Sequence, residues 1–172
     1  APLLAASPAS VSALRARLSD LFRVDGPGDR QQLEAMLVPQ AEAELLMPLK
    51  PTAFTDFCTS YDHIARMAQK APPLAALSLP VAYNGRASSV REDGTPVIRP
   101  QGQFEAPPGS GNVQLAPEPM LDFELEFGVW LRGGNPLGQR ISVAQAEDLM
   151  FGCCLVNDWS ARGIQFFESI LG

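Results

Sequence analysis

Apolar and acidic side chains alternate from Leu121 to Phe127, within the stretch that ends at Trp130, and this is the clearest pattern in the chain. Successive side chains of a β-strand point to opposite faces, so the alternation predicts a strand with one apolar and one anionic face. The apolar positions are Leu121, Phe123, Leu125, Phe127 and Val129, and the acidic positions are Asp122, Glu124 and Glu126.

The anionic face of this strand has two interpretations. Neighbouring carboxylates on one face have Cα atoms roughly 6.5 to 7 Å apart, and the strand contains no Lys or Arg to offset their repulsion. One interpretation is an edge strand whose polar face is solvated, which the spacing alone favours because half-solvated antiparallel strands often alternate in this way. The other is a site for a hard divalent cation, Mg²⁺ or Ca²⁺, held by oxygen ligands.

Helical spacing dominates the first forty residues. Apolar residues recur on one helical face from Ser10 to Phe22, with Ser10 as the expected N-cap, and the glycines and proline at 26–28 end the helix. A second short helix is predicted from Arg30 to Leu37, before Pro39. We interpret residues 1–48 as a helical lead-in segment with a packing role.

The stretch around Asp56 contains the first candidate for proton transfer. Asp56 is predicted to end a strand, and Thr59 or Ser60 can cap a helix that carries His63, the only histidine in the sequence. A lone histidine near a helix start is more often structural than catalytic. Because histidine is the side chain best suited to take up and release a proton near neutral pH, His63 is nevertheless the best available general base.

Patterns on either side of the acidic strand predict a loop before it and a helix, a strand and a second helix after it. Residues 104–119 are rich in Gly and Pro and are predicted to form a loop. The capping box at Ser142 predicts a helix from about Val143 to Met150, ending near Gly152. A buried strand at residues 153–156 then places Asp158, a fourth acid, at its end, and a helix is expected from 161 to 171.

Composition and charge narrow the class of protein. The 172 residues are 46% hydrophobic and 19% charged, which is ordinary for a packed globular protein. The net charge of −6 and the scattered Lys and Arg argue against a nucleic-acid or anionic-membrane surface, so small molecules or proteins are the expected partners.

The expected compartment is the cytosol. No apolar run approaches the roughly 18 residues of a membrane span, and no signal peptide is recognisable. The three cysteines suggest neither a disulfide framework nor a zinc site, and buried thiols are expected.

Five motifs, taken together and in order, resemble the fumarylacetoacetase (fumarylacetoacetate hydrolase) family over roughly residues 40–172. They are Thr55-Asp56-Phe57 with His63, Tyr83 to Ser89, Gly94-Thr95-Pro96 with Arg99 to Gln103, Leu121 to Glu126, and Asn157 to Arg162. The resemblance implies an α+β, β-rich fold, with a mixed β-sandwich or roll as the catalytic domain. Residues 49–172 would form the front part of that domain.

The resemblance also implies a site and a reaction. A divalent cation, Mg²⁺ or Ca²⁺, would be held by Asp56, Glu124, Glu126 and Asp158, with His63 as the general base. The family's reaction is hydrolysis of the C–C bond of 4-fumarylacetoacetate to fumarate and acetoacetate, a step of tyrosine and phenylalanine catabolism. Substrate contacts are implied at Tyr83, Gln165 and Cys58, and Arg162 is given a supporting role.

Four positions depart from the family's pattern. The family usually has Tyr where this chain has Cys58, His at Asn84, an acid at Gly163 and an aromatic residue at Ser169. The proposed ligands and base are kept, so the departures affect the substrate contacts rather than the chemistry. Other oxo-acid reactions of the family (hydratase, isomerase or decarboxylase) and a non-catalytic truncated subunit remain open alternatives.

Family members continue beyond the position of Gly172, into strands that supply a lysine and further substrate contacts. We therefore expect these residues to be the front portion of a longer protein that is an active homodimer at full length. The 172 residues alone are expected to expose an apolar patch, to associate or be poorly soluble, and to be inactive.

Overall fold

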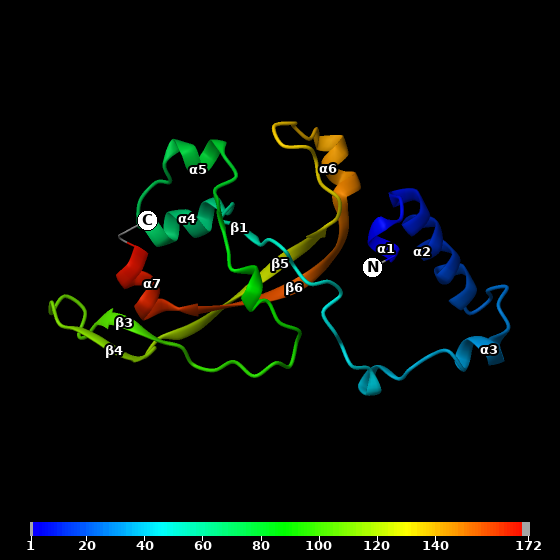
Figure 1. Cartoon of the computed structure of the whole chain (residues 1–172), viewed down its shortest axis with the longest axis horizontal. Helices are drawn as coiled ribbons and strands as arrows, with labels where there is room; N and C mark the ends of the chain where they lie inside the picture. Colours follow the sequence, from blue (N-terminus) through cyan, green and yellow to red (C-terminus); the bar gives the residue numbers. More distant parts are fainter. Residues whose placement is uncertain (1, 170–172) are drawn as a thin grey trace. The chain divides into compact units, whose positions relative to one another are not determined.

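The computed structural model describes residues 2–169 as an α+β structure, which confirms the coarse fold class (Figure 1). Its helices are α1 (Pro2–Ala5), α2 (Pro8–Phe22), α3 (Arg30–Glu34), α4 (Tyr61–Ala68), α5 (Leu74–Ser78), α6 (Val143–Leu149) and α7 (Arg162–Glu168), with the short 3₁₀ helices η1 (Gln40–Glu42) and η2 (Ala87–Ser89). Its strands are β1 (Thr55–Phe57), β2 (Ala82–Asn84), β3 (Gln101–Glu105), β4 (Val113–Pro117), β5 (Leu121–Leu131) and β6 (Met150–Ala161). Within the described residues the strands form three antiparallel pairs, β1–β2, β3–β4 and β5–β6.

The chain divides into two compact units. Unit 1 comprises residues 1–37 and 97–172, and unit 2 comprises residues 38–96. The sequence-based division into residues 1–48 and 49–172 concerns the family's catalytic domain rather than these units, and it stays a prediction.

The long β5–β6 ladder is the main feature of unit 1 and runs as a twisted ribbon in Figure 1. Pairing extends from Leu121 opposite Ala161 to Leu131 opposite Met150. The prediction that Asp158 ends a short strand was therefore wrong, because the ladder continues three residues further, to Ala161. Gly152, expected near the end of a helix, also lies inside β6.

The two predicted helices beside β6 are present. Ser142 forms the expected capping box with Gln145, and α6 ends at Leu149, directly before β6. The helix predicted over residues 161–171 is present as α7, and residues 170 and 171 lie outside the described part of the chain.

On the β5 strand of this ribbon the acidic face is more buried than the apolar face, which is the reverse of the usual arrangement. Phe123, Leu125 and Phe127 are 61%, 74% and 70% exposed, whereas Glu124 and Glu126 on the opposite face are half-buried. An exposed apolar face agrees with the apolar patch expected from the sequence. Cys153 lies on this exposed face of β6, so the expectation that all three thiols are buried was wrong.

From Phe104 onward, the β3–β4 hairpin occupies residues that were predicted to be loop. Only the tip of this segment follows the Gly-rich signal, since Gly109 and Gly111 adopt φ values of 80° and 71°. The carboxylate of Glu105 accepts hydrogen bonds from the backbone N–H groups of both glycines, which lowers its pKa. Phe104 of β3, which composition alone assigned to a loop, is only 5% exposed.

At the N-terminus, α2 begins earlier than predicted. Ser7, rather than Ser10, is the N-cap, and its hydroxyl accepts from the N–H of Ser10 at 3.1 Å. Pro8 fits the first helical position because its missing N–H would have no partner within the helix. The following helix, α3, ends at Glu34 instead of Leu37.

Unit 2 carries β1, β2, α4 and α5. Asp56 lies opposite Tyr83 in the β1–β2 pair, and Ser60 caps α4 by accepting from the N–H of His63 at 3.3 Å. The strand predicted to end at Asp56 continues to Phe57. Gly85 follows β2, and a Cβ there would lie 2.2 Å from the Phe54 ring, so this glycine permits close approach of the ring to the backbone.

None of the described helices is both long enough and apolar enough to span a membrane.

Candidate metal centre

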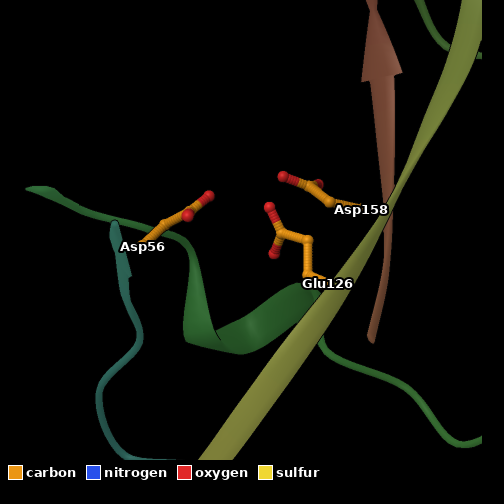
Figure 2. Close-up of side chains that lie close together, drawn as sticks. All are labelled: Asp56, Glu126 and Asp158. Carbon is orange, nitrogen blue, oxygen red and sulfur yellow. The ribbon is translucent and has the colours of Figure 1, made fainter. Parts of the chain in front are cut away.

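Two acids of unit 1 meet on one face of the β5–β6 ladder. Asp158 lies directly opposite Glu124 and diagonally across from Glu126, so all three side chains share a face. A carboxylate oxygen of Glu126 lies within 4.8 Å of one of Asp158, and both residues are half-buried. Figure 2 shows the two carboxylates extending from neighbouring strands to the same side of the ribbon.

Asp56, also drawn in Figure 2, is presented by unit 2. It is half-buried on β1, and the hydroxyl of Tyr83 on β2 donates a hydrogen bond of 2.6 Å to its Oδ2. The cross-strand pairing of these two residues places the phenol beside the carboxylate. Asp56, Glu126 and Asp158 thus each present a half-buried carboxylate oxygen that can bind a cation.

Glu124, the fourth predicted ligand, has a different partner in the structure. Its Oε1 accepts from Nη2 of Arg162 at 2.6 Å, and the same guanidinium contacts Oδ2 of Asp122 at 3.0 Å. Burial by itself lowers the pKa of Arg162, but the hydrogen bonds that it donates to Glu124 and Asp122 outweigh burial and raise that pKa. The pKa of Asp122 is lowered by the N–H of Phe123 and by Arg162.

Sequence reasoning underestimated Arg162, which neutralises two of the three acids on β5. A signal was present, because a strand with three carboxylates and no internal cation requires positive charge from elsewhere. No local pattern identified the source, which lies 38 residues after Glu124.

The other predicted site residues are distributed over both units. In unit 1, Gln165 is exposed on α7 and its Oε1 accepts from Nη1 of Arg162 at 2.9 Å. In unit 2, His63 is exposed in the first turn of α4, and half-buried Cys58 donates its backbone N–H to the carbonyl of Val81. Tyr83 is 60% exposed beside Asp56.

The donor chemistry fits a hard divalent cation. Carboxylate oxygens are the ligands that Mg²⁺ and Ca²⁺ prefer, and soft thiolate ligands are not needed. The half-buried position of the acids strengthens their attraction for a cation relative to fully solvated carboxylates. The fold and this donor set define an α+β protein with a candidate carboxylate centre.

Comparisons with known proteins identify the family. A family model described as fumarylacetoacetate (FAA) hydrolase C-terminal matches residues 52–171. Curated proteins named fumarylacetoacetase are similar: that of Oryza sativa subsp. japonica is 40% identical over 165 residues, and that of Homo sapiens is 36% identical over 170 residues. These matches cover 91% and 93% of this chain. The chain belongs to the fumarylacetoacetate hydrolase family.

The chain spans about two fifths of the length of these curated relatives. The matched region is 38% of both the rice and the human proteins, and 40% of a fumarylacetoacetase of Aspergillus fumigatus that is 36% identical.

Proposed function

We propose that this chain carries the cation centre and part of the substrate site of an enzyme that hydrolyses a C–C bond in a β-diketo acid. The substrate that fits the relatives' names best is 4-fumarylacetoacetate, cleaved to fumarate and acetoacetate. The observation that carries the proposal is the pair of half-buried carboxylates, Glu126 and Asp158, within the residues that match the family.

The proposed cation is Mg²⁺ or Ca²⁺, with Asp56, Glu124, Glu126 and Asp158 as ligands. Two of these acids have other contacts that are compatible with this role. A carboxylate has two oxygens and about four lone-pair sites, so Glu124 can contact Arg162 through Oε1 and a cation through Oε2. Asp56 can likewise accept from Tyr83 and still present its second oxygen.

In the proposed reaction His63 is the general base. It takes a proton from water, whose oxygen forms a bond to a carbonyl carbon of the diketone. The C–C bond then breaks, and its electron pair leaves with the acetoacetate part as an enolate, which is subsequently protonated. A bound divalent cation would supply Lewis acidity that stabilises negative charge on oxygen.

Tyr83, Gln165 and Cys58 are the proposed substrate contacts. The exposed amide of Gln165 can donate through its NH₂ to a developing oxyanion while its oxygen accepts from Arg162. The thiol at 58 and the amide at Asn84 stand where the resemblance expects Tyr and His. These two differences favour, as the second candidate, a hydratase, isomerase or decarboxylase reaction on a related oxo-acid.

The remaining proposals concern the whole protein. The family's catalytic domain would be a β-sandwich or roll, and the active form a homodimer. The enzyme would act in the cytoplasm, in tyrosine and phenylalanine catabolism. The alternative from a different functional class is a non-catalytic subunit.

The test is turnover by the protein at its native length, which an intact-mass measurement establishes. With Mg²⁺ or Ca²⁺ present, loss of the diketone absorbance should yield equimolar fumarate and acetoacetate, and a chelator should abolish the reaction. Conversion of a related oxo-acid without C–C cleavage would replace the first proposal by the second. Absence of turnover on either class, with a folded protein, would support the non-catalytic subunit.

A further inference from the structure

Glu118 is the most deeply buried acid among the described residues, and it lies outside the site discussed so far. Only 1% of it is exposed, in the short connection between β4 and β5. Its backbone is held on both sides, since its N–H donates to the carbonyl of Pro100 and its carbonyl accepts from Arg99. Burying a carboxylate is costly unless hydrogen bonds compensate, so its partners indicate its role.

Three backbone N–H groups converge on the Glu118 carboxylate. They belong to Met120 at 2.7 Å, Gly163 at 3.0 Å and Ile164 at 2.9 Å. Burial alone would raise the pKa of Glu118, but these hydrogen bonds and the charge of Arg99 lower it overall. The carboxylate therefore stays ionised and ties the start of β5 to the first turn of α7.

The first turn of α7 depends on this distant carboxylate. The N-cap residue, Ala161, has no side chain that can accept a hydrogen bond, and the first N–H groups of any helix lack partners within the helix. Glu118 supplies that acceptor from a residue that precedes Gly163 by 45 positions.

Gly163 is matched to this arrangement. A Cβ at position 163 would lie 2.7 Å from Oε1 of Glu118, closer than packed atoms allow, and 3.2 Å from Oε2, which is also a tight contact. The glycine thus provides room for the carboxylate to reach the helix. A side chain at 163 and the present position of the Glu118 carboxylate exclude each other.

We propose that Glu118 is a positioning residue that acts through Arg162. By fixing the first turn of α7 it fixes the guanidinium that contacts Asp122, Glu124 and Gln165. The link to catalysis rests on the proposed function, because Glu124 and Gln165 are proposed as cation ligand and substrate contact. The link from Glu118 to Arg162 does not.

The test follows the side-chain Nε–H of Arg162 by ¹⁵N NMR and measures its hydrogen exchange in the folded protein. Glu118→Ala should speed exchange by about tenfold or more, because charge-assisted hydrogen bonds hold the helix start. Gly163→Ala should do the same by displacing the carboxylate. The double variant should be no worse than Glu118→Ala alone, since the clash disappears with the carboxylate.

A variant that moves the carboxylate from position 118 to position 163 tests whether the protection of Arg162 can be restored. In Glu118→Ala/Gly163→Asp, a carboxylate within the first turn can again accept from the helix N–H groups, and Arg162 exchange should return toward the wild-type rate. The matched control is Glu105→Ala, which removes an acid of the same unit that also accepts from two backbone N–H groups. It should leave Arg162 unchanged. If Glu118→Ala does not fold, Glu118→Gln, which keeps one acceptor oxygen, should show a smaller acceleration.

Unchanged Arg162 exchange in folded Glu118→Ala, or an equal effect of Glu105→Ala, would overturn the proposal. The NMR readout needs neither cation nor substrate, so it stands apart from turnover. In a protein that is active, Glu118→Ala should also weaken Mg²⁺ or Ca²⁺ binding by about tenfold, as loss of support for a ligand usually does. Absence of turnover in the wild type, with the expected Arg162 behaviour, would reject the proposed function and keep the positioning role.

Discussion

The acids of β5 share one face but have different electrostatic partners. Asp122 and Glu124 contact the planar guanidinium of Arg162, whose several N–H groups can bridge two carboxylates at once. Glu126 instead lies beside Asp158. Neutralising two acids by one arginine relieves part of the repulsion along the strand, and the Glu126–Asp158 pair is at the centre of the proposed cation site.

Glu126→Gln should weaken cation binding, because it replaces a charged ligand by a neutral one in the centre of the acid pair. We expect the affinity for Mg²⁺ or Ca²⁺, measured by titration calorimetry, to fall about tenfold or more, as it does for lesser changes around metal ligands. At a cation concentration of about 100 Kd the wild type should gain about 2.7 kcal/mol of stability, seen as a raised Tm, and the variant should lose most of it.

Glu147→Gln, an exposed acid on α6, is the control for this experiment and should bind the cation like the wild type. Equal affinities for all three proteins would show that Glu126 is not a ligand.

His63→Ala tests the proposed base at the same scale. In the native-length protein, kcat should fall by about 10²- to 10⁴-fold, the usual effect of removing a general base, while cation affinity is kept. Asp62→Asn changes the neighbouring exposed residue of α4 and should leave kcat near the wild-type value. Wild-type turnover in a cation-bound His63→Ala protein would exclude the role.

Among the elements, the connection from β4 to β5 and the helix α7 are held together by one ionised group. The folded-state pKa of Glu118 is lowered, so its contribution to stability is present above its ordinary value of about 4.3 and is lost as the pH falls through the lower folded-state value. The ionised carboxylate of Glu118 therefore stabilises the protein at neutral pH, and this stabilisation is lost in acid.

Glu118→Gln should accordingly destabilise the protein more at pH 7 than at pH 3. Urea unfolding of the wild type and of the variant at a series of pH values gives the difference between their midpoints. This difference should shrink as the solution becomes acidic. Some pH dependence will remain in the variant, because the pKa values of Glu105 and Asp122 are lowered as well. A midpoint difference that is the same at pH 7 and pH 3 would show that the charge of Glu118 contributes nothing.

At the scale of the whole molecule, the proposed ligands come from two compact units. Glu124, Glu126 and Asp158 belong to unit 1, and Asp56 belongs to unit 2. A cation bound by all four would make its affinity depend on residues of both units.

Asp56→Asn should therefore weaken Mg²⁺ or Ca²⁺ binding about as strongly as Glu126→Gln, by about tenfold or more. Asp93→Asn, at an exposed loop position of unit 2, is the matched control and should not change the affinity. If Asp56→Asn binds the cation like the wild type while Glu126→Gln does not, the centre is formed by unit 1 alone.

Local patterns in the sequence determined the elements whose cause is local. Alternation gave the β5 strand and its anionic face, because the pleat repeats every two residues. The pair Thr59 and Ser60, of which Ser60 is the cap, and the Ser142 capping box marked the starts of α4 and α6, because the acceptor and the N–H groups are within three residues of each other. The motifs also indicated the candidate acids.

Tertiary structure decided what depends on pairing between distant residues. The β3–β4 hairpin, Asp158 within its strand and the solvent exposure of Phe123 all follow from which strands pair and what covers them. Arg162 contacts Glu124 across 38 residues of sequence, and Glu118 contacts Gly163 across 45. Side-chain periodicity carries no information at such separations. A pattern along the chain records the preference of each residue for a backbone shape, whereas the partner of a charge is fixed only when the chain has folded.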